Sequence, residues 1–152
     1  MSGPSGSGDQ PTRITLGTRF GEFEADSSSV LSFPDGLPGF EHLRRFVVLT
    51  ANAMAPIQCL VAVDAPDVAF LAIDPRLVEP GFNCPLETPD LARLETDGKE
   101  PMVWLAIIAV DESDVITANL HAPVVINPAR MIGRQVLPRT STYSVRHRLG
   151  VA

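Results

Sequence analysis

The stretch Phe33-Pro34-Asp35-Gly36-Leu37-Pro38-Gly39-Phe40 predicts two rigid turns set between bulky apolar residues. The two prolines fix their own φ, and the two glycines can adopt the positive φ that a type II turn needs. Because the prolines also restrict the unfolded chain, ordering this loop costs less conformational entropy. Such a stiff loop either pins the corner of a barrel or presents Leu37 and its aromatic neighbours to a partner. We favour the corner, although one loop can do both.

Outward from this loop, short apolar runs alternate with turn residues at intervals of about ten residues, which is typical of an antiparallel barrel or sandwich. The segment 64–67 (Asp-Ala-Pro-Asp) predicts the turn of a hairpin. One short helix is predicted, with Thr88 as its N-cap and Pro89 at its first position. Strands are predicted over residues 14–16, 23–25, 30–33, 45–50, 58–63, 69–73, 102–110, 116–120, 124–127 and 135–137.

This pattern predicts a mainly β protein: a small antiparallel, β-barrel-like single domain with at most one or two short helices. Residues 12–152 would form the domain, and residues 1–11, rich in Gly, Ser and Pro, predict a flexible N-terminal tail. A chain of this length can bury roughly 68–70% of its unfolded surface, so it needs no metal or disulfide to hold it. We expect its only cysteines, Cys59 and Cys84, to be reduced, buried thiols rather than a disulfide.

The hydropathy of the chain predicts a cytoplasmic protein without a membrane-spanning helix. The longest uninterrupted apolar run, residues 102–110, has nine residues, whereas a transmembrane helix needs about 20. The first residues lack the basic start and the apolar stretch of a secretory signal.

The net charge of −6 is distributed unevenly along the chain. Residues 1–129 carry 7 basic and 18 acidic residues, whereas residues 130–152 carry five arginines and no acid. We expect these arginines to neutralise the acidic body; the alternative is an independent nucleic-acid-binding arm. Tyr143 is the sole aromatic residue among them, so they lack a stacking platform for bases, and the acidic body repels phosphate. Direct binding of RNA or DNA is therefore not expected. The five are Arg130, Arg134, Arg139, Arg146 and Arg148.

Catalytic motifs are absent from the sequence. It contains no Gly-x-Gly-x-x-Gly, P-loop, His-Glu-x-x-His or Gly-x-Ser-x-Gly pattern. The three histidines, His42, His121 and His147, fall in separate segments, so a metal site would need three distant loops to converge. We therefore expect no enzymatic activity, no cofactor, no metal and no small-molecule substrate. A small-ligand barrel or hydrolase stays open as an alternative, and would need a cavity holding converging polar groups.

The run from Thr117 to Asn127 is a candidate contact surface. Pro123 denies its strand one hydrogen-bond donor, which places it at an edge or a bulge. An edge next to a bulge is where another chain can add a strand. Asn119 and Asn127 bracket the interruption and either bond exposed backbone or satisfy the local turns, and we favour the local role.

Five segments in the same order resemble the family of the flagellar assembly factor FliW: the loop 33–40, residues 63–70, residues 117–127, the step Gly133-Arg134-Gln135-Val136 and residues 143–147. The resemblance extends from Ile14 to Leu149. It implies a small antiparallel barrel without enzymatic activity, in the cytoplasm, that binds two partners in turn. One is CsrA, a translational regulator that represses flagellin synthesis, and the other is flagellin itself. Accumulating flagellin would occupy the protein and free CsrA, so flagellin translation would fall.

An export-type chaperone that binds flagellin without a regulatory role is the alternative. The sequence also departs from the family pattern. His121 stands where the family usually carries lysine, Ser144 stands where it usually carries proline, and residues 1–11 have no counterpart. Because histidine is largely neutral near pH 7, the first departure removes charge from that contact.

Two contacts follow from this resemblance as expectations. A domain of net charge −6 docked beside a cationic RNA-binding surface would oppose the approach of phosphates, with Asp67, Glu79 and Glu87 as candidate acids. Flagellin would offer an amphipathic terminal helix to an apolar groove. The predicted partner-binding residues, which include the lining of that groove, are Leu37, Phe40, Asp67, Asn119, Leu120, His121, Pro123, Val124 and Asn127.

Overall fold

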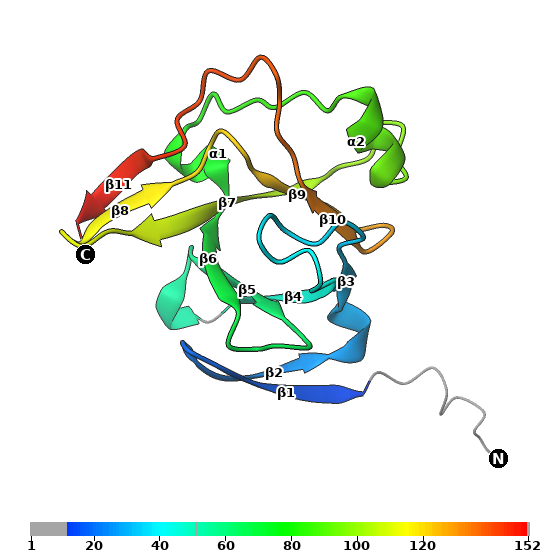
Figure 1. The fold of residues 1–152 in the computed structure, drawn as a ribbon, viewed down its shortest axis with the longest axis vertical. Coiled ribbons are helices and arrows are strands. Elements are labelled where there is room, and N and C mark those ends of the chain that lie inside the picture. The colour runs from blue at the N-terminus through cyan, green and yellow to red at the C-terminus, as the bar shows by residue number, and fades with distance from the viewer. Residues whose placement is uncertain (1–11, 51, 152) are drawn as a thin grey trace.

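The computed structural model describes residues 12–50 and 52–151, and these form a mainly β protein with two short α-helices, as predicted (Figure 1). The predicted tail, residues 1–11, lies outside the described residues. The helices are α1 (Pro75–Val78) and α2 (Thr88–Arg93). The strands are β1 (Arg13–Thr18), β2 (Gly21–Asp26), β3 (Leu31–Ser32), β4 (Arg45–Thr50), β5 (Gln58–Ala62), β6 (Ala69–Ile73), β7 (Val103–Val110), β8 (Val115–Ala118), β9 (Val124–Asn127), β10 (Ile132–Gln135) and β11 (His147–Val151).

Seven strands close into a barrel in the order β7-β6-β5-β4-β3-β10-β9, because β9 pairs back onto β7. Neighbouring strands are antiparallel except β3 and β10, which run parallel through the single pair Ser32–Ile132. The segment 64–67 forms the predicted hairpin turn, since β5 and β6 pair antiparallel around it. Buried side chains from the barrel strands and from the loop after β3 fill the interior, among them Phe33, Phe46, Leu60, Leu105 and Val124.

The long strand β7 is central, as its apolar run predicted, and pairs along its length with β9, β6 and β8. Ile108 faces Ala118, whereas Leu105 faces Val124, so three steps along β7 correspond to six along the opposite chain. Pro123 therefore lies in a bulge, one of the two positions that its missing donor predicts. Both β8 and β9 are paired on each side, so the expected free edge for an added strand is not in this run.

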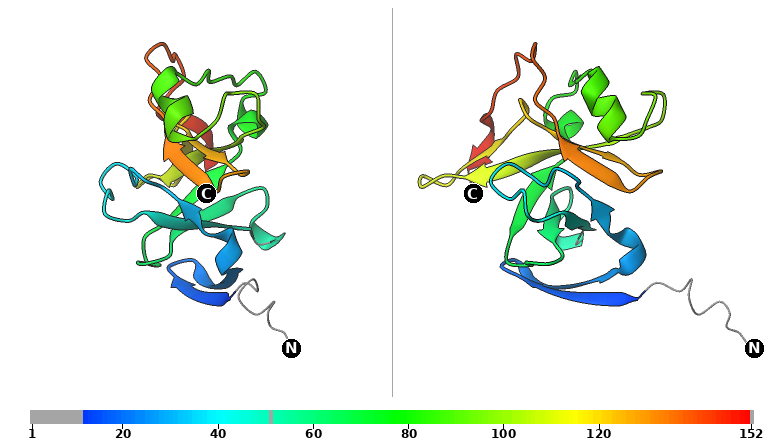
Figure 2. Two further views of the ribbon diagram at one scale, coloured as in Figure 1. Left: turned by 90° about the vertical axis from the view of Figure 1, so that its right-hand side faces the viewer. Right: turned by 45° about the vertical axis from the view of Figure 1, so that its right-hand side comes forward.

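Two smaller units flank the barrel (Figures 1 and 2). The hairpin β1–β2 is a separate sheet that packs on the outer side of β4 and β5, where Leu16 and Ala25 meet Val47 and Val61. At the other end, β8 and β11 continue from β7 as an arm that stands away from the barrel. A further core lies under α2 and the segment before β11, and contains Phe82, Leu94, Trp104, Leu120, Val125 and Val136.

The helix α2 begins one residue earlier than the sequence predicted. Glu87 is its N-cap, and Thr88 and Pro89 are its first two residues. The carboxylate of Asp90, in the first turn, accepts a hydrogen bond from the Glu87 amide at 3.2 Å. Asp90, the third helical residue, thus satisfies the backbone amide of the N-cap residue Glu87. Thr88 is therefore not needed as the N-cap and takes a helical conformation.

Three elements differ from the predicted ones because local signals were ambiguous. Asp74-Pro75 was expected only to close a hairpin, yet the Asp74 carboxylate accepts from the Arg76 amide at 2.9 Å and starts α1. The strand β10 covers 132–135 rather than 135–137, because pairing with β9 and β3 outweighs the weak strand propensity of Gly133. The strand β11 was not predicted, since its short, basic sequence becomes a strand only through pairing with β8.

Candidate functional site

The loop between β3 and β4 forms both predicted turns. Gly36 N–H donates to the Phe33 carbonyl at 2.8 Å, and Phe40 N–H donates to the Leu37 carbonyl at 2.7 Å. Gly36 and Gly39 have φ of 63° and 86°, which confirms their predicted conformations. Leu37 is only 2% exposed and belongs to the barrel core. The loop therefore pins a corner of the barrel, which is the role that we favoured from the sequence.

Aromatic contacts hold this loop against the barrel strands. The ring of Phe33 is fully buried and meets Phe46 edge to face, with 5.0 Å between ring centroids. Phe40, half-buried at the end of the loop, meets Phe70 of β6 in the same way at 5.5 Å. Such pairs favour one ring orientation, so they fix the loop against both β4 and β6.

Four charged side chains tie the same corner to α2 and β10. Asp35 pairs with Arg93 of α2 at 2.6 Å and with Arg134 of β10 at 3.3 Å. The Nε of Arg134 also lies 3.3 Å from Asp90, in the first turn of α2, although without hydrogen-bond geometry. The Arg134 side chain is 23% exposed and stands between the two carboxylates. Sequence reasoning missed this network, because its members come from separate segments and follow no short spacing.

Replacing Arg134 with methionine should lower the free energy of unfolding by about 1–2 kcal/mol, because two carboxylates lose a shared, half-buried partner. Chemical denaturation of the variant measures this loss. The matched control is Arg130→Met, since Arg130 is exposed and makes no ion pair with any described residue. Equal stability of the two variants would contradict a structural role for the network.

Most of the predicted partner-binding residues lie below the surface. Among the nine, Asp67 is exposed, and Phe40, Asn119 and His121 are half-buried. The buried ones pack into the protein and offer no surface to a partner in this structure. They are Leu37, Leu120, Pro123, Val124 and Asn127.

The two asparagines satisfy local backbone, which is the role that we favoured for them. The Asn119 side-chain oxygen accepts from the amides of His121 and Ala122 at 3.1 and 3.0 Å. Asn127 is fully buried; its side-chain nitrogen donates to the Leu94 carbonyl at 2.8 Å, and its oxygen accepts from the Ala129 amide at 3.1 Å. Asn127 thereby joins the end of α2 to the turn after β9.

The loop between β3 and β4 (the corner loop) and residues 119–123 between β8 and β9 (the bulge loop) come together at the end of β10. Gln135 donates to the Ala122 carbonyl at 2.8 Å and also lines a shallow hollow of about 130 Å³ beside the corner loop. Asp67 lies on the β5–β6 turn, whose Ala65 and Val68 pack in the same core as Phe40. We call the exposed surface of residues 34–42, 64–68 and 119–123 the corner surface.

Acidic groups on the corner surface are held ionised by neighbouring donors. Backbone hydrogen bonds, including one from the Gly39 amide at 3.0 Å, lower the pKa of the Glu41 carboxyl from its ordinary value. The Arg45 guanidinium donates to both oxygens of Asp64 and lowers the pKa of that carboxyl as well. This surface therefore keeps its negative charge at neutral pH.

The predicted neutralisation of the C-terminal arginines holds for one of the five. Arg134 pairs with Asp35 and Asp90. Over residues 12–50 and 52–151, no carboxylate comes within ion-pair distance of the other four, which are Arg130, Arg139, Arg146 and Arg148.

The two cysteines are free and buried in different cores, as expected. Burial raises the pKa of Cys84 to about 11, and the carboxylates of Asp90 and Glu87 act in the same direction. Burial likewise raises the pKa of the Cys59 thiol. Because the thiolate is the reactive form, neither side chain has the properties of a nucleophile.

We therefore expect a thiol reagent such as DTNB to react negligibly with the folded protein at pH 8, and with both cysteines in denaturant. At that pH the thiolate fraction of a group titrating near 11 is about one part in a thousand. Absorbance of the released reagent measures the reaction. Rapid reaction of one thiol in the folded protein, or a disulfide in the intact mass, would contradict this arrangement.

The described part of the chain contains no group of three or more His, Cys, Asp or Glu side chains placed to hold a metal ion. None of its helices combines the length and the apolar character that crossing a bilayer requires.

Comparison with known proteins gives a consistent result. The sequence profile of the FliW protein family matches residues 15–149. The flagellar assembly factor FliW of Thermosipho africanus (strain TCF52B) is 34% identical over 134 residues, which cover 87% of this chain and 92% of that protein. The flagellar assembly factor FliW of Geotalea uraniireducens (strain Rf4) is 35% identical over 131 residues, covering 86% of this chain and 80% of that protein.

The fold agrees with these sequence matches. A crystal structure of the flagellar assembly factor FliW superposes with a TM-score of 0.79 at 30% identity, and the match covers 90% of this chain and 96% of that one. The five segments that suggested the resemblance all fall within the matched residues. On both sequence and fold, this chain belongs to the FliW protein family.

Proposed function

We propose that this protein is a cytoplasmic, protein-binding regulator of flagellar assembly that binds CsrA, antagonises its repression of flagellin synthesis, and alternately binds flagellin. Membership of the FliW family carries the proposal, because the relatives that match are flagellar assembly factors. We therefore infer that it works by contact and without catalysis, cofactor or membrane.

The corner surface supports this role as a contact site. It is built on stiff turns, so binding through it costs little ordering entropy. Asp67, His121 and the partly exposed Phe40 are its proposed contact residues, with Asn119 holding the bulge loop in shape. Leu37, Leu120 and Val124 support it from the core, and would reach a partner only if the domain opened.

Antagonism of CsrA is proposed to be electrostatic in part. The candidate acids lie on three elements: Asp67 on the β5–β6 turn, Glu79 at the end of α1 and Glu87 at the start of α2. Because they lie on separate elements, we infer that the RNA phosphates are repelled by the summed negative charge of the protein and not by one acidic residue in direct contact. Screening lengths are about 8 Å at physiological salt, so these charges act only near the RNA path.

We expect RNA release from CsrA to weaken as salt rises, beyond any loss of the protein–CsrA complex itself. Fluorescence anisotropy of a labelled CsrA-binding RNA measures release, and light scattering on the same samples monitors the complex. RNA release that stays constant with salt while the complex remains intact would refute the electrostatic part.

The proposal is tested by adding purified CsrA and purified flagellin separately to the protein and following complex size by light scattering. The proposed regulator forms a complex with each. A flagellin export chaperone, the alternative, binds flagellin alone. A small-ligand barrel binds neither, and that result would overturn the proposal.

A further inference from the structure

The free sheet edge of this fold lies at β11 rather than in the interrupted strand. Strand β11 ends the nine-stranded order and pairs only with β8 among the described residues. Its register shifts between Arg148 and Gly150, which leaves Leu149 in an irregular position. An unpaired edge presents a row of backbone donors and acceptors to any extended chain of suitable shape.

An apolar groove of about 450 Å³ runs beside this edge. Residues 147–150 line it together with residues of β8 and β6. The strand register puts His147, Gly150, Ile116 and Ile73 on one face of the sheet, so the groove lies on that face, beside β11. Leu149, which lines the groove, also packs partly against the neighbouring core. The other apolar lining residues are Pro56, Ile57, Ile73, Val78 and Ile116.

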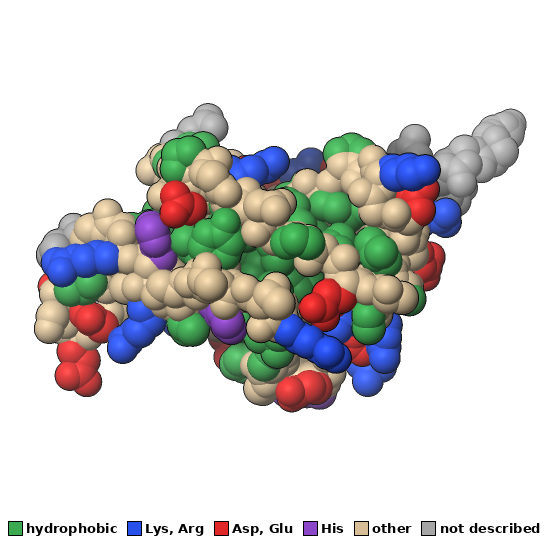
Figure 3. Space-filling model, turned by 90° about the horizontal axis from the view of Figure 1, so that it is seen from above, with side chains coloured by type: hydrophobic (Ala, Val, Ile, Leu, Met, Phe, Trp, Pro, Cys, Tyr) green, Lys and Arg blue, Asp and Glu red, His purple; other side chains and the backbone are tan. Residues whose placement is uncertain are grey.

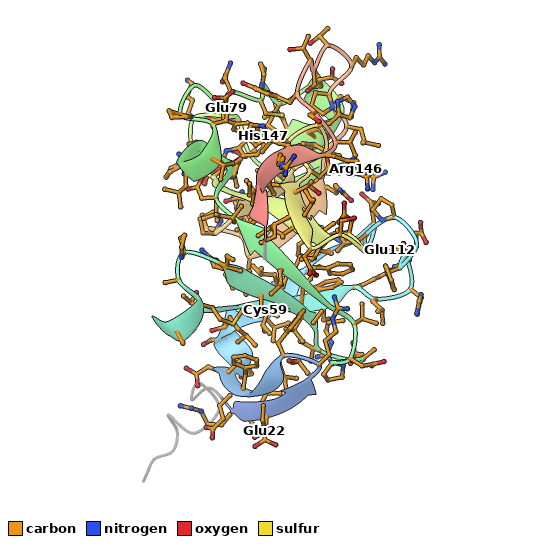
Figure 4. All side chains as sticks on the ribbon, turned by 90° about the vertical axis from the view of Figure 1, so that its left-hand side faces the viewer. Glu22, Cys59, Glu79, Glu112, Arg146 and His147 are labelled. Carbon is orange, nitrogen blue, oxygen red and sulfur yellow. The ribbon has the colours of Figure 1, made fainter. Side chains whose placement is uncertain are left out.

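Two arginines at the start of β11, beside the groove, have no ion-pair partner among the described residues. Arg146 and Arg148 are exposed, and no described carboxylate pairs with either. Figure 4 shows Arg146 and His147 at the start of β11, on the arm that stands off the barrel. From above, both basic and acidic side chains lie on this arm, with apolar ones beside them (Figure 3). The acids of the same arm, Asp111, Glu112 and Asp114, lie on the β7–β8 turn, beyond ion-pair distance of both arginines.

The same features select the occupant. Two copies of β11 would bring like charges together, and the bulge further opposes their pairing. A nucleic acid would use the arginines but leave the apolar groove and the backbone edge unfilled. The lining of the groove holds no Phe, Tyr or Trp, and His147 alone makes no stacking platform for successive bases. An extended polypeptide with alternating carboxylate and apolar side chains satisfies all three features at once.

We propose that the outer edge of β11 and its groove bind an extended, acidic segment of a partner protein by strand addition, with Arg146 and Arg148 recognising its carboxylates. Apolar side chains of the segment fill the groove over Ile57, Ile116 and Leu149. The inference rests on the proposed protein-binding function, but it assigns a surface distinct from the corner surface.

Titration of the ¹⁵N-labelled full chain with short peptides tests the surface. A peptide of alternating valine and glutamate should shift the amide resonances of residues 146–151. The lysine counterpart of the peptide should not, and neither should the glutamate peptide N-methylated at alternate residues, which cannot add as a strand. The double variant Arg146→Glu with Arg148→Glu should bind the glutamate peptide about tenfold more weakly. The matched control, Arg130→Glu with Arg139→Glu, has the same net charge and should bind normally.

Two outcomes would overturn the proposal that this surface binds a peptide strand. One is equal resonance shifts with the N-methylated peptide. The other is a single-stranded RNA of similar length that shifts the same resonances and binds more tightly than the peptide. Unchanged unfolding midpoints would show that both double variants are folded, as expected for exposed arginines. Wild-type binding to neither CsrA nor flagellin would instead sink the proposed function, whatever the peptide does. Normal partner binding without any peptide shift sinks the β11 proposal alone.

Discussion

Gly133→Ala will lower the free energy of unfolding by about 3 kcal/mol, because the barrel has no room for a side chain at this position. A Cβ built there would lie 2.4 Å from Cζ of Phe33 and 2.7 Å from its Cε1. The ring cannot withdraw easily, since it is fully buried against Phe46. The glycine thus lets the corner loop close on β10. Urea denaturation followed by tryptophan fluorescence measures the loss.

Two controls separate this clash from a general effect of removing a glycine. Gly17→Ala, in β1, should leave stability nearly unchanged, because its Cβ would meet nothing within 4 Å. In the Phe33→Leu background, Gly133→Ala should cost much less than in the wild type, since the shorter side chain vacates the contested space. Additive losses in that double variant, or a stable Gly133→Ala, would contradict the close approach of the two elements.

Asn127→Asp, which replaces the side-chain NH2 group by an oxygen, will lower the free energy of unfolding by about 3 kcal/mol at pH 7. The side-chain nitrogen of Asn127 donates to the Leu94 carbonyl at 2.8 Å in a fully buried position. A carboxylate there would place a negative oxygen against a carbonyl oxygen. Burial and this repulsion should raise the pKa of the introduced carboxyl above its unfolded value near 4.

The pH dependence gives the sign of this effect. The deficit relative to the wild type should be small below the unfolded pKa and should grow as pH rises through the folded one. Both proteins must be compared at each pH, because the wild type itself loses stability in acid. Its Asp74 has a pKa lowered by Arg76, so that contribution disappears as pH falls below the ordinary range.

Asn119→Asp is the matched control for this variant. The Asn119 oxygen accepts from two amides, and a carboxylate accepts from them equally well. Stability at pH 7 should therefore be retained or slightly raised. A similar loss in both variants would mean that the two asparagines do not differ in the way that the hydrogen bonds indicate.

Features encoded locally could be predicted from the sequence. Pro38 and Gly39 specify their turn by backbone preference alone, and the hairpin around 64–67 follows from turn residues between apolar runs. The central strand β7 was visible as the longest apolar run. These signals need no knowledge of what packs against them.

Features that depend on distant partners could not be predicted in this way. Arg134 meets Asp35 across 99 positions of sequence, and no pattern indicates such a pair. Leu120 and Val124 flank a bulge, where strand alternation no longer tells the inner from the outer face. For that reason apolar residues proposed as a groove proved to be core, while the edge at β11 went unnoticed.

We propose that this one protein binds two partners in alternation through its exterior. Adding flagellin to a purified complex of this protein with CsrA, and resolving the mixture by size-exclusion chromatography with light scattering, tests that claim most directly. We predict that flagellin displaces CsrA and forms its own complex in proportion to the amount added. A stable assembly of all three proteins, or CsrA that stays bound at excess flagellin, would contradict the claim.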